Sequence, residues 1–509
     1  TSEQGGKRLM LQSLFASDFI KNFPLFAIIL CLLCAVISFV LSGSGARRLT
    51  YVLVSVGMGL NCSVLLHNLI TGERFTYMMG HFPAPWGNEI AAGLLEPAFA
   101  LLFGVVILCS VAAGKSRILL DVRADKQNFY YILVDLAQVA MFALCYTNDI
   151  FTGYVFIEIC TLASCGLLMI REGGKPLVAA TRYMIFNLIG SGMFLIGITL
   201  LYGVTGHLLF PQLQEAAAAA WSSGVYHGVM VVSIGLTVSG LAIKSGLFPF
   251  HFWMPDTYGT ATPSSSGILS GVISKGYIFL LIKIIYRVYG HDLFMETGIQ
   301  NILFLFGIAG MIIGSVSAIR ARTITKMTAF SSAAQIGYIF MGIGMGTREA
   351  MIAVCFHICA HAITKPVLFL SGGALIDASD GKRDFHSLHG AAHRNPAAGF
   401  AFLCGSLSMI GFPIFTGFIS KLYFALSAFA FPHKSMLVLL ALAVSTILNV
   451  IYFMYVSVIL YSGKADPARR VGFRQQRTFT VAVFVLVLVN VAIGLHSQPL
   501  TSLFEAGLD

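Results

Sequence analysis

The sequence predicts an all-α polytopic membrane protein with about 14 transmembrane helices. Three observations support this fold class. Hydrophobic residues make up 57% of the 509 residues and charged residues only 11%, whereas soluble domains carry about 25% charged residues. The apolar residues form runs close to the roughly 20 residues that cross a bilayer. Lysine and arginine gather in alternate loops between these runs.

Fourteen apolar segments account for the chain in order, and each has the length and composition of a membrane-crossing helix. We expect helices 1 to 14 at 23–41, 50–70, 89–113, 128–146, 151–170, 177–204, 225–255, 264–286, 299–318, 324–346, 349–376, 397–429, 436–461 and 478–496. No polar stretch between them is long enough for a soluble domain, so the functional groups are expected within the membrane.

The basic residues support this assignment, because cytoplasmic loops are enriched in lysine and arginine. They are concentrated in the loops that follow helices 1, 3, 5, 9, 11 and 13. This pattern predicts that those loops are cytoplasmic and that both termini lie outside. It also accounts for the net charge of +10, so we do not infer a nucleic-acid partner.

Two predicted helices carry related helix-breaking motifs. Helix 7 contains GLFPF at Gly246–Phe250, and helix 12 contains GFPIF at Gly411–Phe415. Proline removes a backbone donor and interrupts a helix, so we predict breaks at Pro249 and Pro255 in helix 7 and at Pro413 in helix 12. Each broken helix is the fourth of a five-helix run, and an odd number of spans inserts the second copy inverted.

The sequence therefore predicts two inverted five-helix repeats, helices 4-8 and helices 9-13. The predicted divisions are N-terminal helices 1-3 at 1–127, the first repeat at 128–287, the second repeat at 288–463, and a C-terminal loop with helix 14 at 464–509.

Two lysines next to the first break are the main candidate functional residues. A lysine at mid-bilayer costs about 2.5–3.5 kcal/mol on insertion scales, so it usually has a partner, a water-filled cavity or a function. Lys244 lies just before the break, and Glu158 in helix 5 is its nearest chemical match, so we predict an ion pair. Lys275 lies at mid-depth in helix 8, and we predict a proton relay there. A purely structural hydrogen-bonding role is the alternative for Glu158.

Helix 11 carries His357, His361 and Lys365 at successive four-residue steps. This spacing places all three on one helix face over roughly 12 Å of rise, which suits a proton path through water. Two histidines at this spacing can also bind zinc, but no third ligand is evident and Ile358 replaces the glutamate of the zinc-protease motif. Lys421 in helix 12 lies eight residues beyond Pro413, and we predict that it ends the path near the outside.

Other charged residues in the apolar segments are expected to have structural roles. Glu96 in helix 3 and Asp135 in helix 4 are interpreted as hydrogen-bonding groups. Lys283 lies near the outer end of helix 8 beside Arg287, where we expect its long side chain to reach the membrane interface. The ten cysteines are scattered singly in apolar sequence, so they are interpreted as buried apolar side chains.

The chain resembles the antiporter-like membrane subunits shared by respiratory complex I, membrane-bound hydrogenases and formate hydrogenlyases, and multi-subunit Mrp-type Na+/H+ antiporters. It is most similar to the Mrp D-type subunit and its quinone-proximal complex I counterpart. The motifs that carry this resemblance are GYVFIE ending at Glu158, GLAIKSGLFPFHFWMPDTYGTATPSSSGIL around Lys244, SKGYIFLLIK around Lys275, KMTAFSSAAQIGY from Lys326 to Tyr338, HAITKPVLFLSGG from His361 to Gly373, and GFPIFTGFISK ending at Lys421.

The resemblance implies specific roles for the candidate residues. Glu158 and Lys244 would form the coupling ion pair and Lys275 the central relay. The face formed by His357, His361 and Lys365 would connect the relay to Lys421, the exit lysine. Lys421 stands where one branch of the family carries a glutamate.

We therefore expect a proton-translocating subunit of a larger complex in a prokaryotic cytoplasmic membrane. Whether it moves H+ alone or exchanges Na+ for H+ is left open by the sequence. Its expected partners are other membrane subunits, including antiporter-like paralogues and small helical subunits, together with H+, Na+ and lipid but no nucleic acid. We expect no cofactor on this chain, and iron-sulfur clusters, flavin or nickel-iron only on partners. A stand-alone cation/proton exchanger and a structural anchor of a hydrogenase or dehydrogenase remain the alternatives.

Overall fold

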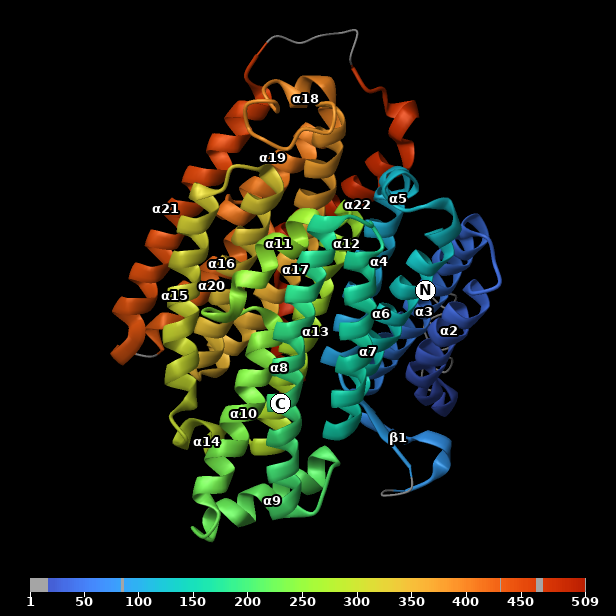
Figure 1. The fold of residues 1–509 in the computed structure, drawn as a ribbon. Coiled ribbons are helices and arrows are strands. Elements are labelled where there is room, and N and C mark those ends of the chain that lie inside the picture. The colour runs from blue at the N-terminus through green and yellow to red at the C-terminus, as the bar shows by residue number, and fades with distance from the viewer. Residues whose placement is uncertain (1–16, 84–86, 431, 464–469, 509) are drawn as a thin grey trace, which may run out of the picture.

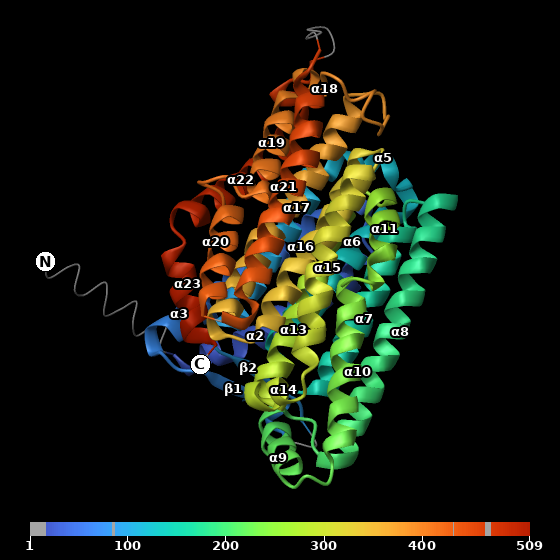
Figure 2. The same ribbon diagram turned by 90° about the vertical axis from the view of Figure 1, so that its left-hand side faces the viewer.

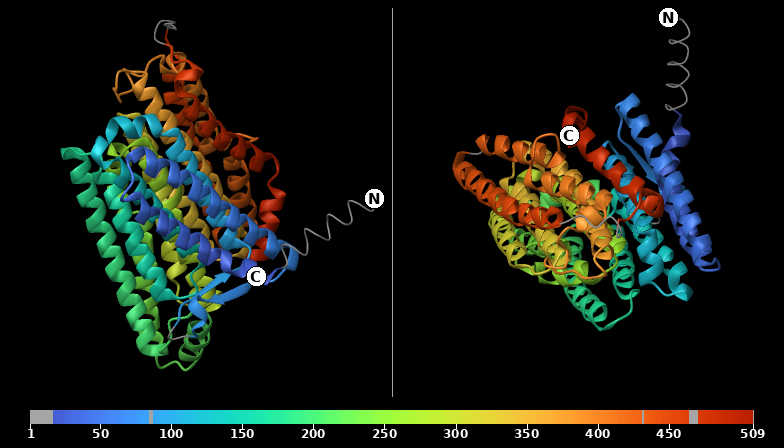
Figure 3. Two further views of the ribbon diagram at one scale, coloured as in Figure 1. Left: turned by 90° about the vertical axis from the view of Figure 1, so that its right-hand side faces the viewer. Right: turned by 90° about the horizontal axis from the view of Figure 1, so that it is seen from above.

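A computed structural model describes residues 17–83, 87–430, 432–463 and 470–508. The chain forms a bundle of long helices that run between two ends (Figure 1). We name the two ends by the orientation that the basic loops predict: the end that carries α5 and α18 is called the inner end, and the end that carries β1, α9 and α14 is called the outer end. Seen from above, the bundle is elongated, with α2 and α3 (blue) at one side and α21 (orange-red) at the opposite side (Figure 3).

The N-terminal part contains three long helices and a small hairpin. Its elements are η1 (Asp18–Asn22), α2 (Phe23–Ser38), α3 (Gly43–Thr71), β1 (Phe75–Met78), η2 (Met79–His81), β2 (Glu89–Ala92), α4 (Leu95–Ala113), α5 (Lys115–Asp121) and η3 (Ala124–Lys126). Strands β1 and β2 pair antiparallel. The predicted start of helix 3 at residue 89 is therefore wrong, because residues 89–92 pair as a strand before the helix begins at Leu95.

The middle of the chain contains the first predicted repeat. Its elements are α6 (Gln127–Tyr146), α7 (Ile150–Met169), α8 (Gly174–Thr205), α9 (Phe210–Ser222), α10 (His227–Ser245), η4 (Phe250–Trp253), α11 (Met254–Thr260), α12 (Pro263–Ile268), the π-helical turn η5 (Leu269–Ile273), α13 (Ser274–Ile284), the π-helical turn η6 (Ile285–Tyr289) and α14 (His291–Glu296). Figure 2 shows α7, α8 and α10 side by side at one edge of the bundle.

The second predicted repeat and the C-terminal helices follow. Their elements are α15 (Ile299–Arg320), α16 (Ile324–Met345), α17 (Arg348–Asp377), α18 (Ala391–Arg394), α19 (Pro396–Ile410), α20 (Thr416–Phe429), α21 (Pro432–Tyr461), η8 (Phe473–Gln476), α22 (Arg477–Leu495) and α23 (Gln498–Gly507). Helix α17 lies at the centre of this half, and nearly all of its residues are buried.

All fourteen predicted ranges contain helix, but the count of fourteen spans is not confirmed. Twelve helices in the described ranges are long and apolar enough to cross a membrane. The two further predicted spans are α16, whose buried face carries several hydroxyl and amide groups, and the broken pair α19 and α20, which are 15 and 14 residues long. The predicted domain boundaries stay predictions, and the boundary at 463/464 adjoins residues outside the described ranges. Residues 1–16, which make up most of the N-terminus predicted to lie outside, are also outside the described ranges.

Predicted helices 7 and 12 are both broken. Helix α10 ends at Ser245, Gly246 follows with φ +80°, and the chain resumes as η4 and α11 after Pro249. The break predicted at Pro255 is absent, because η4 runs directly into α11 and Pro255 lies in its first turn, where no backbone donor is required. Helix α19 ends at Ile410, Gly411 follows with φ +94°, and α20 begins beyond Pro413. Each break leaves helix-terminal carbonyl groups inside the bundle.

Helices α15 and α16 approach each other closely because glycines line their contact. A β-carbon on Gly337 would lie 2.5 Å from the Met311 amide nitrogen and 2.6 Å from the Gly307 carbonyl oxygen. Small residues at such contacts allow the backbones of membrane helices to pack against each other. This pair forms the wall of the second repeat beside α17.

We expect Gly337→Ala to destabilise the protein by about 1–3 kcal/mol, because the added methyl group would force α15 and α16 apart. Gly203→Ala in α8 is the matched control, since a β-carbon there meets nothing within 4 Å. Thermal unfolding of both purified variants in detergent measures the difference. Equal melting temperatures for the two variants would contradict the close approach.

Candidate functional site

The predicted ion pair between Glu158 and Lys244 is formed across α7 and α10. The Lys244 Nζ lies 3.4 Å from Glu158 Oε1 and donates a 2.8 Å hydrogen bond to Thr161 Oγ1. Ser191 of α8 also donates to Glu158. The Lys244 side chain is fully buried, whereas the Glu158 side chain is 25% exposed at the edge of the bundle. The pair therefore connects the interior with the bundle surface at α7.

The break in α10 helps to place Lys244. It is the penultimate residue of the half-helix, where the exposed carbonyl ends and the helix dipole favour a cation. Helices α8 and α10 are unusually close here, because a β-carbon on Gly240 would lie 2.5 Å from the Gly190 carbonyl oxygen. These two glycines bring Lys244 within reach of α7 and α8.

Lys275 lies on α13 directly after the π-helical turn η5. In this turn the Ser274 amide donates to the Leu269 carbonyl, five residues back, instead of the usual four. The Lys275 Nζ donates to the Ser270 carbonyl and, at 3.1 Å, to Ser274 Oγ. Such π turns are frequent at functional sites. Lys275 is fully buried and has no carboxylate within ion-pair distance among the described residues.

The predicted row on α17 is buried, and it consists of His357, His361 and Lys365. The Lys365 Nζ donates to Ser331 Oγ and, at 3.1 Å, to the Thr328 carbonyl, both on α16. The rings of His357 and His361 are nearly parallel, with centroids 6.2 Å apart. Neither ring nitrogen of His361 has a hydrogen-bond partner among the described residues. Buried polar atoms of this kind are usually satisfied by ordered water.

Lys421 lies on α20 but reaches back across the second helix break. Its Nζ donates to the Ile410 carbonyl at 2.7 Å and to Thr446 Oγ1 at 3.2 Å. It also lies 5.5 Å from the centre of the Tyr338 ring, which in turn stacks on His357 at 5.3 Å. His357 Nδ1 is 3.0 Å from Ser420 Oγ, on the residue before Lys421. The structure thus places Lys421 at the end of the α17 row.

The candidate basic residues form a series that runs through both halves of the bundle. We call it the buried series; its members are Lys244, Lys275, Lys365, His361, His357 and the half-buried Lys421. Lys275 and Lys365 belong to neighbouring elements, because η5 packs directly on α17 and Ser270 Oγ lies 2.9 Å from Ser332 Oγ of α16. Among the described residues, only Lys244 of the proposed series has a carboxylate partner. Proton binding and release are therefore the simplest way for the other lysines to change charge.

The expectation that Lys283 reaches the membrane interface is wrong. Its side chain is buried, and its Nζ donates to the carbonyls of Cys145 at 2.7 Å and Thr147 at 2.6 Å. The helix end of α6 leaves these carbonyls without helical partners, so they attract the ammonium group. Glu96 is also buried, and it forms an ion pair with Arg287.

The Glu96 and Arg287 pair was not found by sequence reasoning. Both residues lie near the predicted ends of apolar segments, where a charged side chain normally meets water. One feature of the sequence could have indicated the pair: Glu96 in predicted helix 3 and the bases Lys283 and Arg287 of predicted helix 8 lie at a similar predicted depth. Asp135 has the predicted structural contacts, since Oδ2 accepts from Cys34 and Thr50 at 3.1 Å each.

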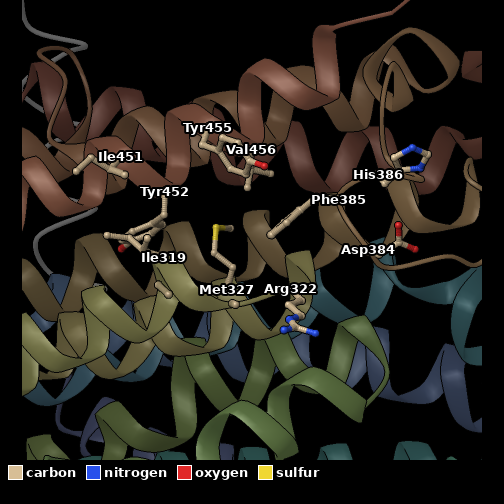
Figure 4. Close-up of a pocket in the computed structure, with 12 residues that line it drawn as sticks. Ile319, Arg322, Met327, Asp384, Phe385, His386, Ile451, Tyr452, Tyr455 and Val456 are labelled. Carbon is tan, nitrogen blue, oxygen red and sulfur yellow. The ribbon is translucent and has the colours of Figure 1, made fainter.

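The cavity at the inner end of the bundle lies apart from the series. A cavity of about 500 Å³ opens at the inner end between α15, α16, α21 and the loop at Asp384 (Figure 4). Its lining is mainly apolar and contains none of the buried basic residues. Within the described ranges, His, Cys, Asp and Glu side chains do not converge in groups of three or more that could hold a metal ion.

A membrane-spanning helical bundle with broken helices and a buried series of ionisable side chains defines a class of ion-translocating membrane subunits. The family described as NADH:quinone oxidoreductase/Mrp antiporter, TM, matches residues 147–449. The chain belongs to this family, as the motif resemblance predicted.

Individual relatives agree with this assignment. The N-type subunit of the NADH-quinone oxidoreductase of Desulforudis audaxviator is 31% identical over 454 residues, which cover 86% of this chain and 88% of the relative. The D-type subunit of a Na(+)/H(+) antiporter of Bacillus subtilis is 22% identical over 93% of this chain and 94% of the relative.

Solved structures share the fold. A chain in the structure of the Mrp complex from Dietzia sp. DQ12-45-1b matches with a TM-score of 0.86 at 22% identity, over 97% of both chains. A chain of respiratory complex I from Thermus thermophilus matches with a TM-score of 0.73 at 22% identity, over 95% of this chain and 100% of the other.

Proposed function

We propose that this chain is the proton-translocating membrane subunit of a multi-subunit complex. The observation that carries the proposal is the buried series of basic groups, most of which lack a carboxylate partner among the described residues. Burial of an uncompensated charge in a membrane protein is costly, so such groups are retained mainly where they move ions. The proposed path begins at Glu158 and Lys244, continues through Lys275 and ends at Lys421 by way of His357, His361 and Lys365.

The proposed coupling step acts on the Glu158 and Lys244 pair. When the two side chains are in contact, each stabilises the charged form of the other, and their separation favours the neutral forms. A movement of a neighbouring subunit against α7 would change this contact, because Glu158 is partly exposed there. The resulting change of charge at Lys244 would then favour proton uptake or release at Lys275.

The partners, ions and location of the protein are part of this proposal. Two named relatives are subunits of larger assemblies, and one of them is a Na(+)/H(+) antiporter subunit. We therefore propose membrane subunits, H+ and Na+ as the partners of this chain, within a lipid bilayer and with both termini outside. Any iron-sulfur, flavin or nickel-iron cofactor would be carried by a partner subunit.

We expect Glu158→Gln to reduce coupled proton transport at least about tenfold, equivalent to about 1.4 kcal/mol in rate. The amide keeps the shape of the side chain but cannot stabilise the Lys244 ammonium by charge. Proton uptake into vesicles that contain the reconstituted complex measures the effect. Glu172→Gln is the control, because Glu172 forms only exposed ion pairs in the loop after α7.

The same assay separates the alternatives. A structural anchor predicts normal transport in Glu158→Gln, which would contradict the proposal. A stand-alone exchanger predicts sodium-dependent proton flux from the purified chain alone in vesicles. Absence of flux from the single chain, with transport restored by its copurifying partners, supports the multi-subunit function.

A further inference from the structure

A polar cavity of about 430 Å³ lies at the outer end of the bundle and is separate from the proposed path. Its walls come from the start of α4, the loop after α3, α9, the C-terminal helix α23 and one face of α13 and η6. Figure 2 shows α23, the β1 and β2 hairpin and the chain end close together at this end. The loop residues at its mouth, including Glu73 and Arg74, are exposed.

The cavity extends into the bundle along α13. It is lined by Phe279 and Lys283 of α13 and by Arg287 of the following turn η6, which are spaced four residues apart. Such residues lie one above the other on a helix face, about 6 Å apart along the axis. The cavity therefore extends about two helical turns inward from Arg287. Lys275, the proposed relay, lies one further turn along the same helix.

More positively charged side chains lie around the cavity than a single structural ion pair requires. The buried carboxylate of Glu96 is already paired with Arg287. Lys283 and Arg74 also lie close enough to act on Glu96 electrostatically. Lys283 has three N–H donors, of which two bind the carbonyls at the end of α6. Lys283 therefore has one N–H donor left and, among the described residues, no carboxylate of its own, and it lines a polar cavity. We infer that this donor contacts water in the cavity.

An aromatic cluster surrounds Phe279, which lies between Lys283 and Lys275 along α13. The Phe279 ring lies in the deepest part of the cavity and packs on Phe99 of α4, with centroids 4.5 Å apart. Phe99 in turn stacks on Phe504 of α23, with centroids 5.9 Å apart. All three rings are buried. Hydrophobic constrictions of this kind control the passage of ions by excluding water.

We propose that the cavity is a second port for protons, which connects the outer aqueous phase with Lys275 through Lys283. In this proposal Lys283 is the innermost charged group of the port, and Phe279 is the hydrophobic constriction between the port and the relay. The proposal rests on the proposed function of Lys275. It assigns an outer access route to the first half of the bundle, in addition to the route predicted at Lys421.

The first test locates the water and does not depend on transport. Lys283→Cys is introduced into the complex in sealed right-side-out vesicles, and a membrane-impermeant cationic methanethiosulfonate reagent is added from outside. We expect Lys283→Cys to be labelled when Cys62 and Cys165 are both replaced by serine, and the same chain without Lys283→Cys to stay unlabelled, because the other eight native cysteines are buried. Lys275→Cys is the matched control on the same helix and is expected to stay unlabelled behind Phe279.

Either of two results in this test would overturn the proposal. One is an unlabelled Lys283→Cys in an assembled complex, and the other is labelling of Lys283→Cys only from the inner side. Neither result bears on the proposed function, which is tested by transport in variants of the buried series.

The second test addresses the constriction. We expect Phe279→Ala to speed the passive decay of an imposed pH gradient roughly tenfold, equivalent to about 1.4 kcal/mol of barrier, and Phe279→Leu to change it little. Adding Lys275→Met to Phe279→Ala should abolish the leak. An unchanged leak in assembled Phe279→Ala would overturn the port. If Phe279→Ala does not assemble, labelling of Lys275→Cys with Phe279 intact decides, and strong labelling there would contradict a constriction at this residue.

Discussion

Lys275→Arg is expected to abolish coupled proton transport even though the positive charge is kept. The guanidinium group cannot be deprotonated in proteins, whereas a buried ammonium can change its protonation state. The geometry at Lys275 allows such a change, because its amine binds one backbone carbonyl and one hydroxyl group, and no carboxylate among the described residues holds it charged. We expect a loss of about a hundredfold or more, the lower end of what a positioned proton-transfer group contributes.

The comparison with an uncharged variant makes this result specific. Lys275→Met removes the charge at similar length, and it should lose transport to the same extent. Copurification of the partner subunits and the melting temperature show whether each complex assembles. Normal transport in Lys275→Arg with loss in Lys275→Met would mean that the site acts by fixed charge, and proton relay through Lys275 would be wrong.

Glu96→Gln is expected to destabilise the protein by about 3–5 kcal/mol. Removing one partner of a buried ion pair leaves the other charge uncompensated in a low-dielectric environment. The Glu96 side chain is fully buried and the Arg287 side chain is 17% exposed, so the pair is largely removed from water. Glu96 Oε2 also accepts a 2.8 Å hydrogen bond from the Gly93 amide, which positions the start of α4.

The free energy of unfolding in detergent, from denaturant titration, measures this effect. Glu73→Gln is the control, since Glu73 lines the outer cavity together with Arg287 but is exposed. The double variant Glu96→Gln with Arg287→Met should recover part of the loss, because no unpaired arginine then remains. A single variant as stable as the parent would show that water compensates Arg287 fully.

Some features of the site followed directly from residue types and spacing. The four-residue steps on α17 placed His357, His361 and Lys365 in one buried row. Glycine and proline in apolar sequence located both helix breaks. The Glu158 and Lys244 pair was predicted from chemistry alone, because only a few acids occur deep in the apolar segments.

Other features could not be predicted because they depend on how helices are rotated and paired. Glu96 and Arg287 are 191 residues apart in sequence, and each alone looks like an ordinary charge near a membrane interface. Lys283 was expected at that interface, but α6 ends beside it and presents two unpaired carbonyls. The Lys421 contact with Ile410 likewise requires α20 to fold back across the break.

The sequence by itself determined that the chain is a bundle of membrane-crossing helices, which two of them break, and that Lys244, Lys275, His357, His361 and Lys365 lie inside. It could do so because the bilayer imposes length and polarity limits on each segment separately. Only the tertiary structure decided which of these residues meet, which carbonyls bind the lysines and where polar space remains between helices. Those properties arise from side-chain packing between distant segments, and the hydropathy of each segment carries no information about that packing.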